Sequence, residues 1–425
     1  MKKAVRKQLY VHAARPMFRA GLESGATASP HNPLRLLLKS KYRVVLLSAF
    51  FSYMSFGLLF QIFPPFLPAI QHGFDIDHAA ASLVMTVFLI PMAAAAIPSG
   101  SIADHWGVRA TGVTGLSVMA LGSVITMFSA SFALLLAGRA VSGFGAALLL
   151  VSILKLLTST IPAEQHGIAF GLFVAGLPVG TGISFDLLSS FRTILGWRGE
   201  NAIATAVIIA ALILYWLAAR SRGVEHYQSA TSVIGILRNR GMPGLLATVI
   251  LGYTAIIGFT TWAPSTLVSY AHISIWLASV IASILLLIDI PLSPLFGSLS
   301  DRLNRRKLFV VLAFLIYALA SLFVPIAATS PSWLVGLALI AVISIMGGGC
   351  AMFFPSALTI PAKNLPAGDA GKAYGLFFTA QIVGMTLGPI LIGYSLDAGP
   401  SYAGFLTVTV ITFLGLLASL MIIAR

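Results

Sequence analysis

Charged residues are scarce in this 425-residue chain, and acidic residues are the scarcest. Only 9% of the residues are charged, with 12 Asp and Glu against 26 Lys and Arg, whereas 58% are hydrophobic. A soluble domain of this length would need far more charge to cover its surface. The composition therefore excludes a soluble globular protein and indicates a protein that lies in a membrane.

Cysteine and metal-ligand patterns are also missing. The single cysteine, Cys350, excludes an intramolecular disulfide and a cysteine-based metal cluster. The eight histidines form neither a His-x-x-x-His nor a His-x-x-Glu-His spacing. No polar catalytic cluster or sizeable extramembrane domain is visible, although a membrane-embedded enzyme or receptor would need one. We therefore expect no metal, no cofactor and no enzymatic activity.

Long apolar runs are what the chain has in abundance. Its mean hydropathy is +0.97, and runs of the ~20 residues that cross a bilayer as a helix recur along it. The runs do not alternate in polarity, which argues against a membrane β-barrel. We predict an all-α polytopic membrane protein with twelve transmembrane helices: Val44–Pro68, His78–Ser101, Ala110–Ala130, Phe132–Leu156, Gly167–Leu188, Trp197–Ala219, Met242–Tyr270, Ile273–Ser298, Lys307–Ala328, Trp333–Leu358, Gly371–Leu396 and Tyr402–Ile423.

A short cassette occurs twice, each time after a long apolar run. Gly100-Ser-Ile-Ala-Asp104-His-Trp-Gly107-Val-Arg109 reappears as Gly297-Ser-Leu-Ser-Asp301-Arg-Leu-Asn304-Arg305. A second pair of similar segments, 162–173 and 366–377, supports a duplication. The repeat predicts two pseudo-symmetric six-helix bundles, 44–219 and 242–425, joined by a linker at 220–241 and preceded by a basic tail at 1–43.

The distribution of Lys and Arg predicts the orientation. If the N-terminus is inside, 23 of the 26 basic residues fall on the inner side, so both termini are expected to be cytoplasmic. The outer loops then carry acids: Asp75, Asp77, Glu200 and Asp397. Because the positive charges line membrane loops, we expect anionic lipids as partners and no nucleic acid. The plasma (inner) membrane is the expected location, and a monomer is the expected state. The Arg-rich tail leaves an organelle transit peptide open as an alternative.

These motifs resemble those of the major facilitator superfamily. Gly100, Asp104, Gly107 and Arg109 match the family's loop signature, whereas Asn304 departs from it in the second copy. The segment 139–145 resembles the family's arginine-bearing fourth helix, and Gly196-Trp-Arg198 the start of its sixth. The resemblance implies a secondary transporter that moves a small-molecule substrate through a central site by alternating access.

The cassette itself indicates a gate. Gly100 and Gly297 would let helices approach closely, and Asp104 and Asp301 would pair with nearby basic residues and helix ends. Gly107, Arg109 and Arg305 complete the predicted gating motif, with Asp104 as the stronger latch. The alternative is ordinary interfacial charge.

Two ionisable residues stand out inside the spans, where a charge is costly unless it is paired or wetted. Arg139 would bind an anionic substrate group or respond to a protonatable partner; alternatively it forms a fixed ion pair with Asp186. Asp289 would load and release protons, or else brace the helix broken by Pro291 and Pro294. Lys155, near the inner boundary, would extend toward the headgroups rather than bind.

The remaining candidates are uncharged. Gln61 and Gln381 would hydrogen-bond a ligand or a neighbouring helix. The resemblance places aromatics along the cavity: Tyr53, Phe56, Tyr253, Trp262, Phe353 and Phe354. The expected function is proton-coupled transport of a small organic solute, with an organic anion as one candidate. A likeness of Gly176–Gly182 to a family exporter motif, echoed by Gly388-Pro389, keeps export of drugs or metabolites open, and an uncoupled uniporter is the other alternative.

Overall fold

The computed structural model describes residues 40–161, 166–219, 233–239, 241–303, 305–328, 332–358, 360, 370–400 and 402–422. The chain divides into two compact units, Met1–Arg43 and Val44–Arg425. Apart from the first turn of one helix, the described residues belong to the second unit. The predicted tail and most of the predicted linker lie outside the described residues.

The predicted all-α membrane fold is confirmed. The described residues form helices joined by short turns, without a strand among them. Among the described residues, eleven helices are long and apolar enough to cross a membrane, and a shorter apolar helix, Leu172–Leu187, supplies a twelfth segment. The twelve segments coincide with the twelve predicted runs to within several residues.

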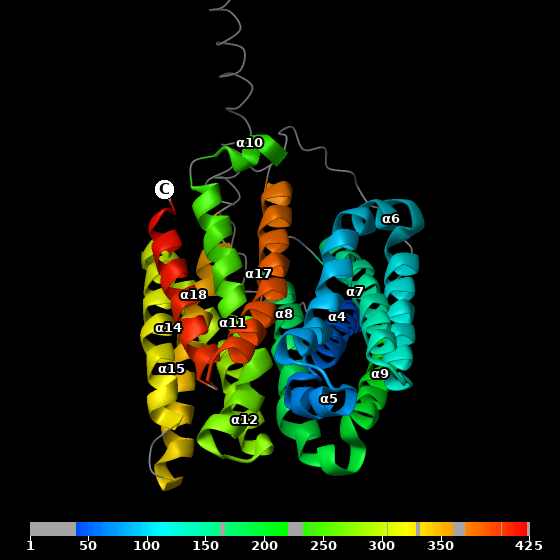
Figure 1. The fold of residues 1–425 in the computed structure, drawn as a ribbon. Coiled ribbons are helices and arrows are strands. Elements are labelled where there is room, and N and C mark those ends of the chain that lie inside the picture. The colour runs from blue at the N-terminus through cyan, green and yellow to red at the C-terminus, as the bar shows by residue number, and fades with distance from the viewer. Residues whose placement is uncertain are drawn as a thin grey trace, which may run out of the picture. The chain divides into compact units, whose positions relative to one another are not determined.

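The first six segments occupy one side of Figure 1, coloured blue to green. Most of them are single helices, but the fifth passes from an α-helix into a π-helical turn, η3, and a 3₁₀ turn, η4. The elements are α4 (Ser40–Phe60), η1 (Pro64–Phe66), α5 (Leu67–Phe74), α6 (His78–Met127), α7 (Phe132–Thr160), α8 (His166–Gly182), η3 (Ile183–Leu187), η4 (Leu188–Phe191) and α9 (Arg192–Ala218).

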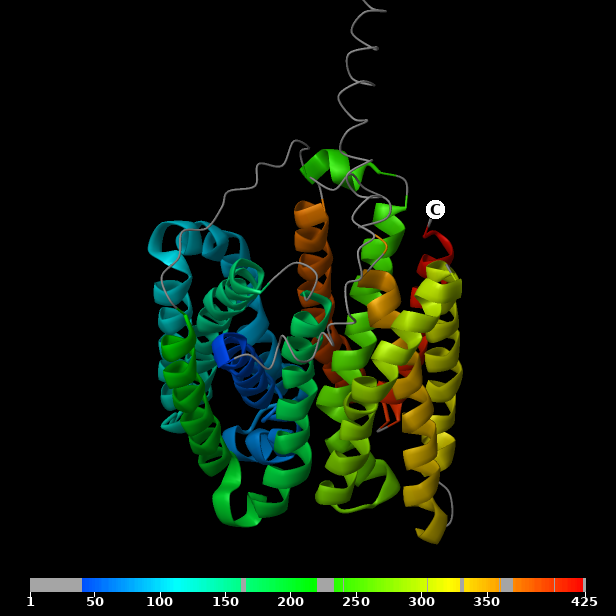
Figure 2. The ribbon, with the colours of Figure 1, turned by 180° about the vertical axis from the view of Figure 1, so that it is seen from behind.

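The second six segments form the other bundle, coloured green to red (Figures 1 and 2). Its eighth segment is broken into two helices at Ile288. The elements are α10 (Val233–Leu237), α11 (Met242–Ala271), α12 (Ile275–Leu287), α13 (Asp289–Leu303), α14 (Arg306–Ala328), α15 (Ser332–Leu358), α17 (Ala370–Ala398) and α18 (Ala403–Leu420).

Local sequence explains where several helices begin and end. Pro64 and Pro65 help to end α4, because a proline has no N–H to donate to the carbonyls of the preceding helical turn. Gly107 has a φ of 82°, which a side chain disfavours, and it breaks α6 into the second and third spans. Asp77 begins α6 as an N-cap, accepting a hydrogen bond from the Ala80 N–H at 2.7 Å.

Both bundles pack one helix pair in the same way. In the first bundle, Gly176 and Gly180 of α8 press directly on the backbone of α4; in the second, Gly384 and Gly388 of α17 press on the backbone of α11. A Cβ at any of these four positions would collide with a backbone carbonyl oxygen. Two glycines of the exporter-like segment Gly176–Gly182 thus let α8 pack closely on α4.

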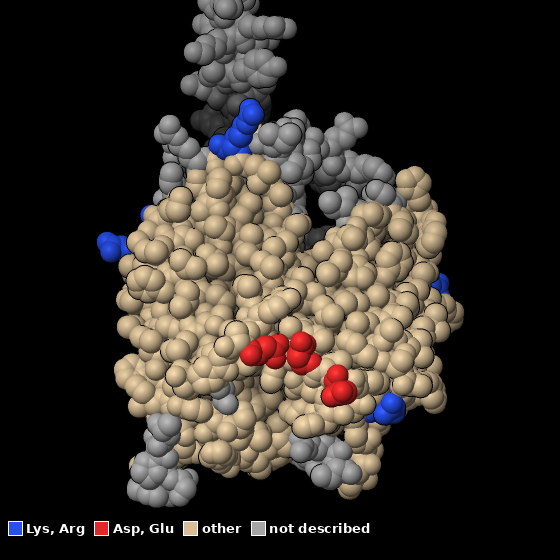
Figure 3. Space-filling view, viewed as in Figure 1, with Lys and Arg blue, Asp and Glu red and all other residues tan. Residues whose placement is uncertain are grey.

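The two bundles touch at one end of the molecule. There α6 contacts α17, and η3 contacts α12. At the opposite end, where α6 bends at Gly107, the space-filling view shows a notch between the bundles (Figure 3). We name these the latch end, where α6 begins, and the cassette end, where Gly107 lies.

Candidate functional site

Two tyrosines occupy matching places in the two bundles. Tyr53 lies on α4 and Tyr253 on α11, both partly exposed, and the Cβ of each touches a packing glycine of the neighbouring helix. The two tyrosines thus stand at equivalent positions of the two bundles, each beside a packing glycine. Other rings flank them: Phe56 and Phe173 at Tyr53, and Phe353 and Phe354 at Tyr253.

Asp289 joins this cluster from the break between α12 and α13. It interacts electrostatically with Tyr253 and Cys350, and Ser293 supplies a hydrogen bond to its carboxyl group. Its Oδ1 atom is buried and has no hydrogen-bond partner among the described residues. A buried carboxylate oxygen without a partner is costly in a membrane, so this oxygen is suited to accept a proton or a cationic group.

Arg139 is held by the backbone of its own bundle. Its guanidinium donates to the carbonyl oxygens of Val84 at 2.8 Å, Leu59 at 2.8 Å and Phe60 at 3.3 Å. Leu59 and Phe60 end α4, and the Phe60 carbonyl lacks its usual helical donor because the residue four positions later is Pro64. The rings of Phe63 and Phe88 also face the guanidinium, which is only 1% exposed.

These contacts give Arg139 a structural role that differs from both alternatives drawn from the sequence. The hydrogen bonds of Arg139 go to carbonyls, and Asp186 accepts a hydrogen bond from Ser283 of α12 at 2.7 Å. One of the three acceptors had a signal in the sequence, because Pro64 leaves the Phe60 carbonyl without a helical donor. The sequence did not show which side chain would supply it.

The other predicted site residues divide by exposure. Gln381, on α17, is partly exposed, as are Tyr53, Tyr253 and Phe354. Five others are buried: Gln61, Phe56, Trp262, Phe353 and Arg139. Gln61 lies just past the end of α4 with a buried Oε1 that has no partner among the described residues.

The predicted gating motif is described in part. Arg109 lies 4.6 Å from the ring centroid of Trp216 on α9, a cation–π contact that ties the third span to the sixth. Arg305 is exposed. The side-chain surroundings of Asp104, Gly297 and Asp301 lie outside what the structure describes, and so does Asn304.

Gly100 has open space beside it among the described residues. A Cβ at this position would meet no described atom within 4 Å, so the expected close approach of helices at Gly100 is not seen in the described part of the chain in this conformation. The Nζ atom of Lys155 donates a hydrogen bond to the Gly100 carbonyl oxygen at 2.9 Å, a contact with α6 that the sequence did not predict.

We expect Gly100→Val to leave the midpoint of thermal unfolding unchanged and to slow transport about tenfold. The added side chain has space in this conformation, but it would overpack a closed cassette end, and overpacking costs ~1–3 kcal/mol. Thermal unfolding and uptake by proteoliposomes measure the two effects. Unchanged uptake would show that helices never close on Gly100.

The contacts that join the bundles at the latch end were missed from the sequence. His78 and Asp397 lie 319 residues apart, and their side chains form an ion pair with 2.6 Å between Nδ1 and Oδ1. Acidic side chains form a short row on this face (Figure 3). The only signal in the sequence was that both residues stand at span ends predicted on the same side.

Glu200 was predicted in an outer loop, and this is wrong. It lies within α9 and is 0% exposed, next to Asn201, whose side-chain amide donates to the Ser123 carbonyl oxygen at 2.6 Å. Gly196, with a φ of 57°, kinks α9 just before Trp197, so Glu200 lies in the first part of the predicted span Trp197–Ala219 and not in the loop before it.

Comparison with known proteins establishes the family. The Major Facilitator Superfamily model matches residues 45–288 and 266–425, so it covers nearly all of the chain. Together with the fold, this match shows that the chain belongs to the major facilitator superfamily. It is an integral, multi-pass membrane protein.

Its relatives include transporters of several kinds. The chain is 25% identical to the lysosomal dipeptide transporter MFSD1 of Mus musculus over 67% of its own length, and it spans 63% of that protein. It is 23% identical to the multidrug resistance protein Stp of Mycobacterium tuberculosis, over 78% of this chain and 72% of Stp. It is 22% identical to the 4-hydroxybenzoate transporter PcaK of Pseudomonas aeruginosa, over 77% of this chain and 81% of PcaK.

Proposed function

We propose that this protein is a secondary transporter that moves a small organic solute across a membrane by alternating access. The observation that carries the proposal is the pair of matching aromatic clusters at Tyr53 in one bundle and Tyr253 in the other, together with the buried, unpartnered carboxylate oxygen of Asp289. Contact at the latch end and a notch at the cassette end fit a conformation open at one end only. Relatives named as transporters support the same activity.

The cluster favours a cationic or neutral solute over an organic anion. Asp289 is the acid in it, and aromatic rings beside a carboxylate suit an organic cation. Arg139, the cation that suggested an anionic solute, lies between two phenyl rings and donates to three carbonyls. An anion such as the 4-hydroxybenzoate of one relative is therefore the second candidate.

We further propose that Asp289 couples transport to protons. A proton that moves down a membrane potential of 100 mV releases ~2.3 kcal/mol, enough to sustain a solute gradient. The unpartnered Oδ1 would hold the proton in one conformation and release it in the other. By the excess of basic residues in its loops, the cassette end would face the cytoplasm, where anionic lipids would contact them.

The first experiment identifies the solute. Purified protein is screened by thermal shift against organic cations, neutral dipeptides, lipophilic drugs and aromatic carboxylates, because a ligand stabilises the folded state according to its concentration over Kd. We expect organic cations or neutral compounds to raise the unfolding midpoint, and Asp289→Asn to abolish the shift for cations. A shift by carboxylates alone would overturn the proposed solute class.

We expect Asp289→Asn to lose accumulation driven by an imposed pH gradient in proteoliposomes while it still exchanges labelled solute across the membrane. Loss of the ionisable group removes the driving step, whereas exchange needs only the alternation of the bundles. Asp75→Asn, at an exposed position with a φ of 52° that asparagine tolerates, is the matched control. Full gradient-driven uptake by Asp289→Asn would refute the proton role, and equal transport with and without an ionophore would select the uniporter.

A further inference from the structure

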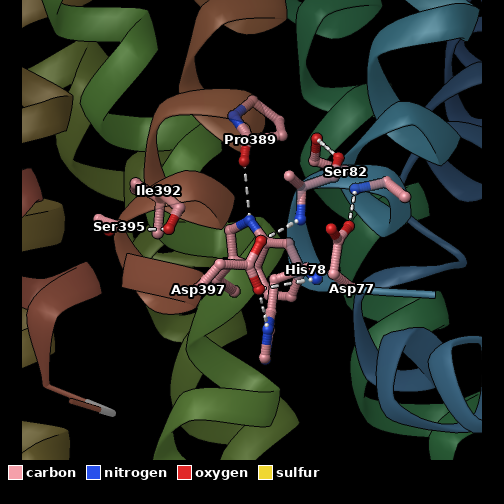
Figure 4. A network of polar contacts seen from close by, with 10 residues as sticks. Asp77, His78, Ser82, Pro389, Ile392, Ser395 and Asp397 are labelled. Atoms are coloured by element: carbon pink, nitrogen blue, oxygen red, sulfur yellow. Dashed lines mark hydrogen bonds and ion pairs between the residues drawn. The ribbon is translucent and has the colours of Figure 1, made fainter. Parts of the chain in front are cut away.

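One carboxylate of the second bundle caps a helix of the first. The first three amides of α6 belong to His78, Ala79 and Ala80, and such amides have no partner within their own helix. The Asp77 carboxylate accepts a hydrogen bond from the Ala80 N–H at 2.7 Å. The Asp397 carboxylate, in the last turn of α17, accepts hydrogen bonds from the His78 N–H at 3.0 Å and the Ala79 N–H at 2.8 Å (Figure 4).

The same carboxylate also binds the side chain of His78. Its Oδ1 lies 2.6 Å from Nδ1 of the imidazole, so Asp397 accepts three hydrogen bonds from one turn of α6. The pair is accessible, with 41% of the His78 side chain and 26% of the Asp397 side chain exposed. A solvated ion pair between two flexible side chains contributes little, but here two of the three donors are fixed backbone amides.

The surroundings hold this contact in one geometry. The Trp262 ring of α11 lies 5.3 Å from the His78 ring, and its indole N–H donates to the Pro389 carbonyl oxygen of α17 at 2.9 Å (Figure 4). A Cβ on Gly393 of α17 would lie 3.0 Å from the His78 carbonyl oxygen. The end of α17 therefore fits closely against the start of α6.

Helix electrostatics make the docked position favourable for Asp397 and the undocked position unfavourable. A carboxylate in the last turn of a helix adds negative charge to an end that already carries a partial negative charge. Docking places the same carboxylate at the positive end of α6, where anions are stabilised. The electrostatic energy of the Asp397 carboxylate thus depends strongly on whether α17 is docked against the start of α6.

We propose that Asp397 is a gate residue, which holds the latch end closed by capping α6 and must leave that helix before the latch end can open. The imidazole of His78 has a smaller role, because it supplies only one of the three hydrogen bonds to Asp397. The inference rests on the proposed alternation of the bundles. Its test needs no substrate, so the gate and the transported solute can fail independently.

The test measures how often the latch end opens. Thr86, on α6 and 1% exposed, faces the Thr386 carbonyl oxygen of α17 deeper in the same interface. Thr86→Cys in a Cys350→Ala background places the only thiol of the protein behind the gate. The rate at which a bulky hydrophilic maleimide modifies this thiol in nanodiscs reports opening.

We expect Asp397→Asn to raise the labelling rate about tenfold, since it replaces charge-assisted hydrogen bonds by weaker neutral ones. His78→Ala should raise it by less, because both amide bonds remain. Asp75→Asn, an exposed acid just before α6, should label at the parental rate. Size-exclusion profiles and complete labelling in detergent denaturant verify folding and thiol reactivity.

Labelling of folded Asp397→Asn at the parental rate would overturn the proposal. An effect of His78→Ala larger than that of Asp397→Asn would also overturn it, because the ring and not the amide cap would then hold the gate. If Asp397→Asn does not fold, Asp397→Glu decides: its longer side chain misplaces the carboxylate, and unchanged labelling would count against the gate.

Discussion

Replacement of Arg139 by glutamine is expected to lower the free energy of unfolding by at least about 3 kcal/mol. The guanidinium donates to three carbonyls in a region where water cannot replace it, and each buried carbonyl left without a donor costs ~1–3 kcal/mol. A glutamine side chain is shorter and carries one NH₂ group, so it cannot serve three acceptors. Thermal unfolding in detergent and the monodisperse fraction in size-exclusion chromatography measure the loss.

Arg139→Lys tests the geometry of the same site. The ammonium keeps the charge but lacks the planar fork that reaches several carbonyls and faces the rings of Phe63 and Phe88. We expect Lys to recover less than half of the lost stability. Arg198→Gln is the matched control, because Arg198 is exposed and also donates to a carbonyl, that of Ser129 at 2.8 Å. Normal stability of Arg139→Gln would show that the carbonyls find other donors.

The sequence predicted the architecture well because apolar length and repetition can be read without knowledge of any spatial contact. Each of the twelve runs is a property of one segment, and the duplicated cassette is a direct match between two segments, at Gly100 and at Gly297. Asp289 could also be identified, since an acid inside an apolar run is conspicuous. These features depend on the composition of one segment and not on its neighbours in space.

The contacts of the charged residues could not be predicted, because they depend on helix rotation and on backbone acceptors. Arg139 finds carbonyls from α4 and α6, which carry no side-chain signal. Asp397 finds the amides of a helix 318 and 319 residues away. A sequence shows which charged side chains need a partner. It does not show which backbone groups will serve, because every residue carries the same backbone groups.

The paired glycines could be predicted in part: their spacing is visible in the sequence, but the helix that they contact is not. Gly176 and Gly180 have the same four-residue spacing as Gly384 and Gly388, and each pair stands in the corresponding helix of its bundle. The spacing places both glycines of a pair on one helix face. Only the structure shows that this face meets α4 in one bundle and α11 in the other.

Gly180→Val and Gly388→Val are each expected to prevent normal folding. A Cβ at Gly180 would collide with the carbonyl oxygen of Met54, and a Cβ at Gly388 with that of Thr254. Backbone atoms cannot move aside as flexible side chains do, so the helices must separate and leave a gap along their contact. Overpacking an ordinary core typically costs ~1–3 kcal/mol, and a backbone collision cannot be relieved by a change of side-chain rotamer.

The measurement compares the yield of monodisperse protein and its unfolding midpoint with those of Gly336→Val. Gly336 lies on α15, also inside an apolar helix, and a Cβ there would meet nothing within 4 Å. The control therefore matches the loss of a glycine and the gain of a β-branched side chain, but not the collision. If the two bundles are built alike, Gly180→Val and Gly388→Val should be equally severe. A severe effect of only one would mean that the two helix pairs, despite their matching glycines, do not contribute equally to the fold.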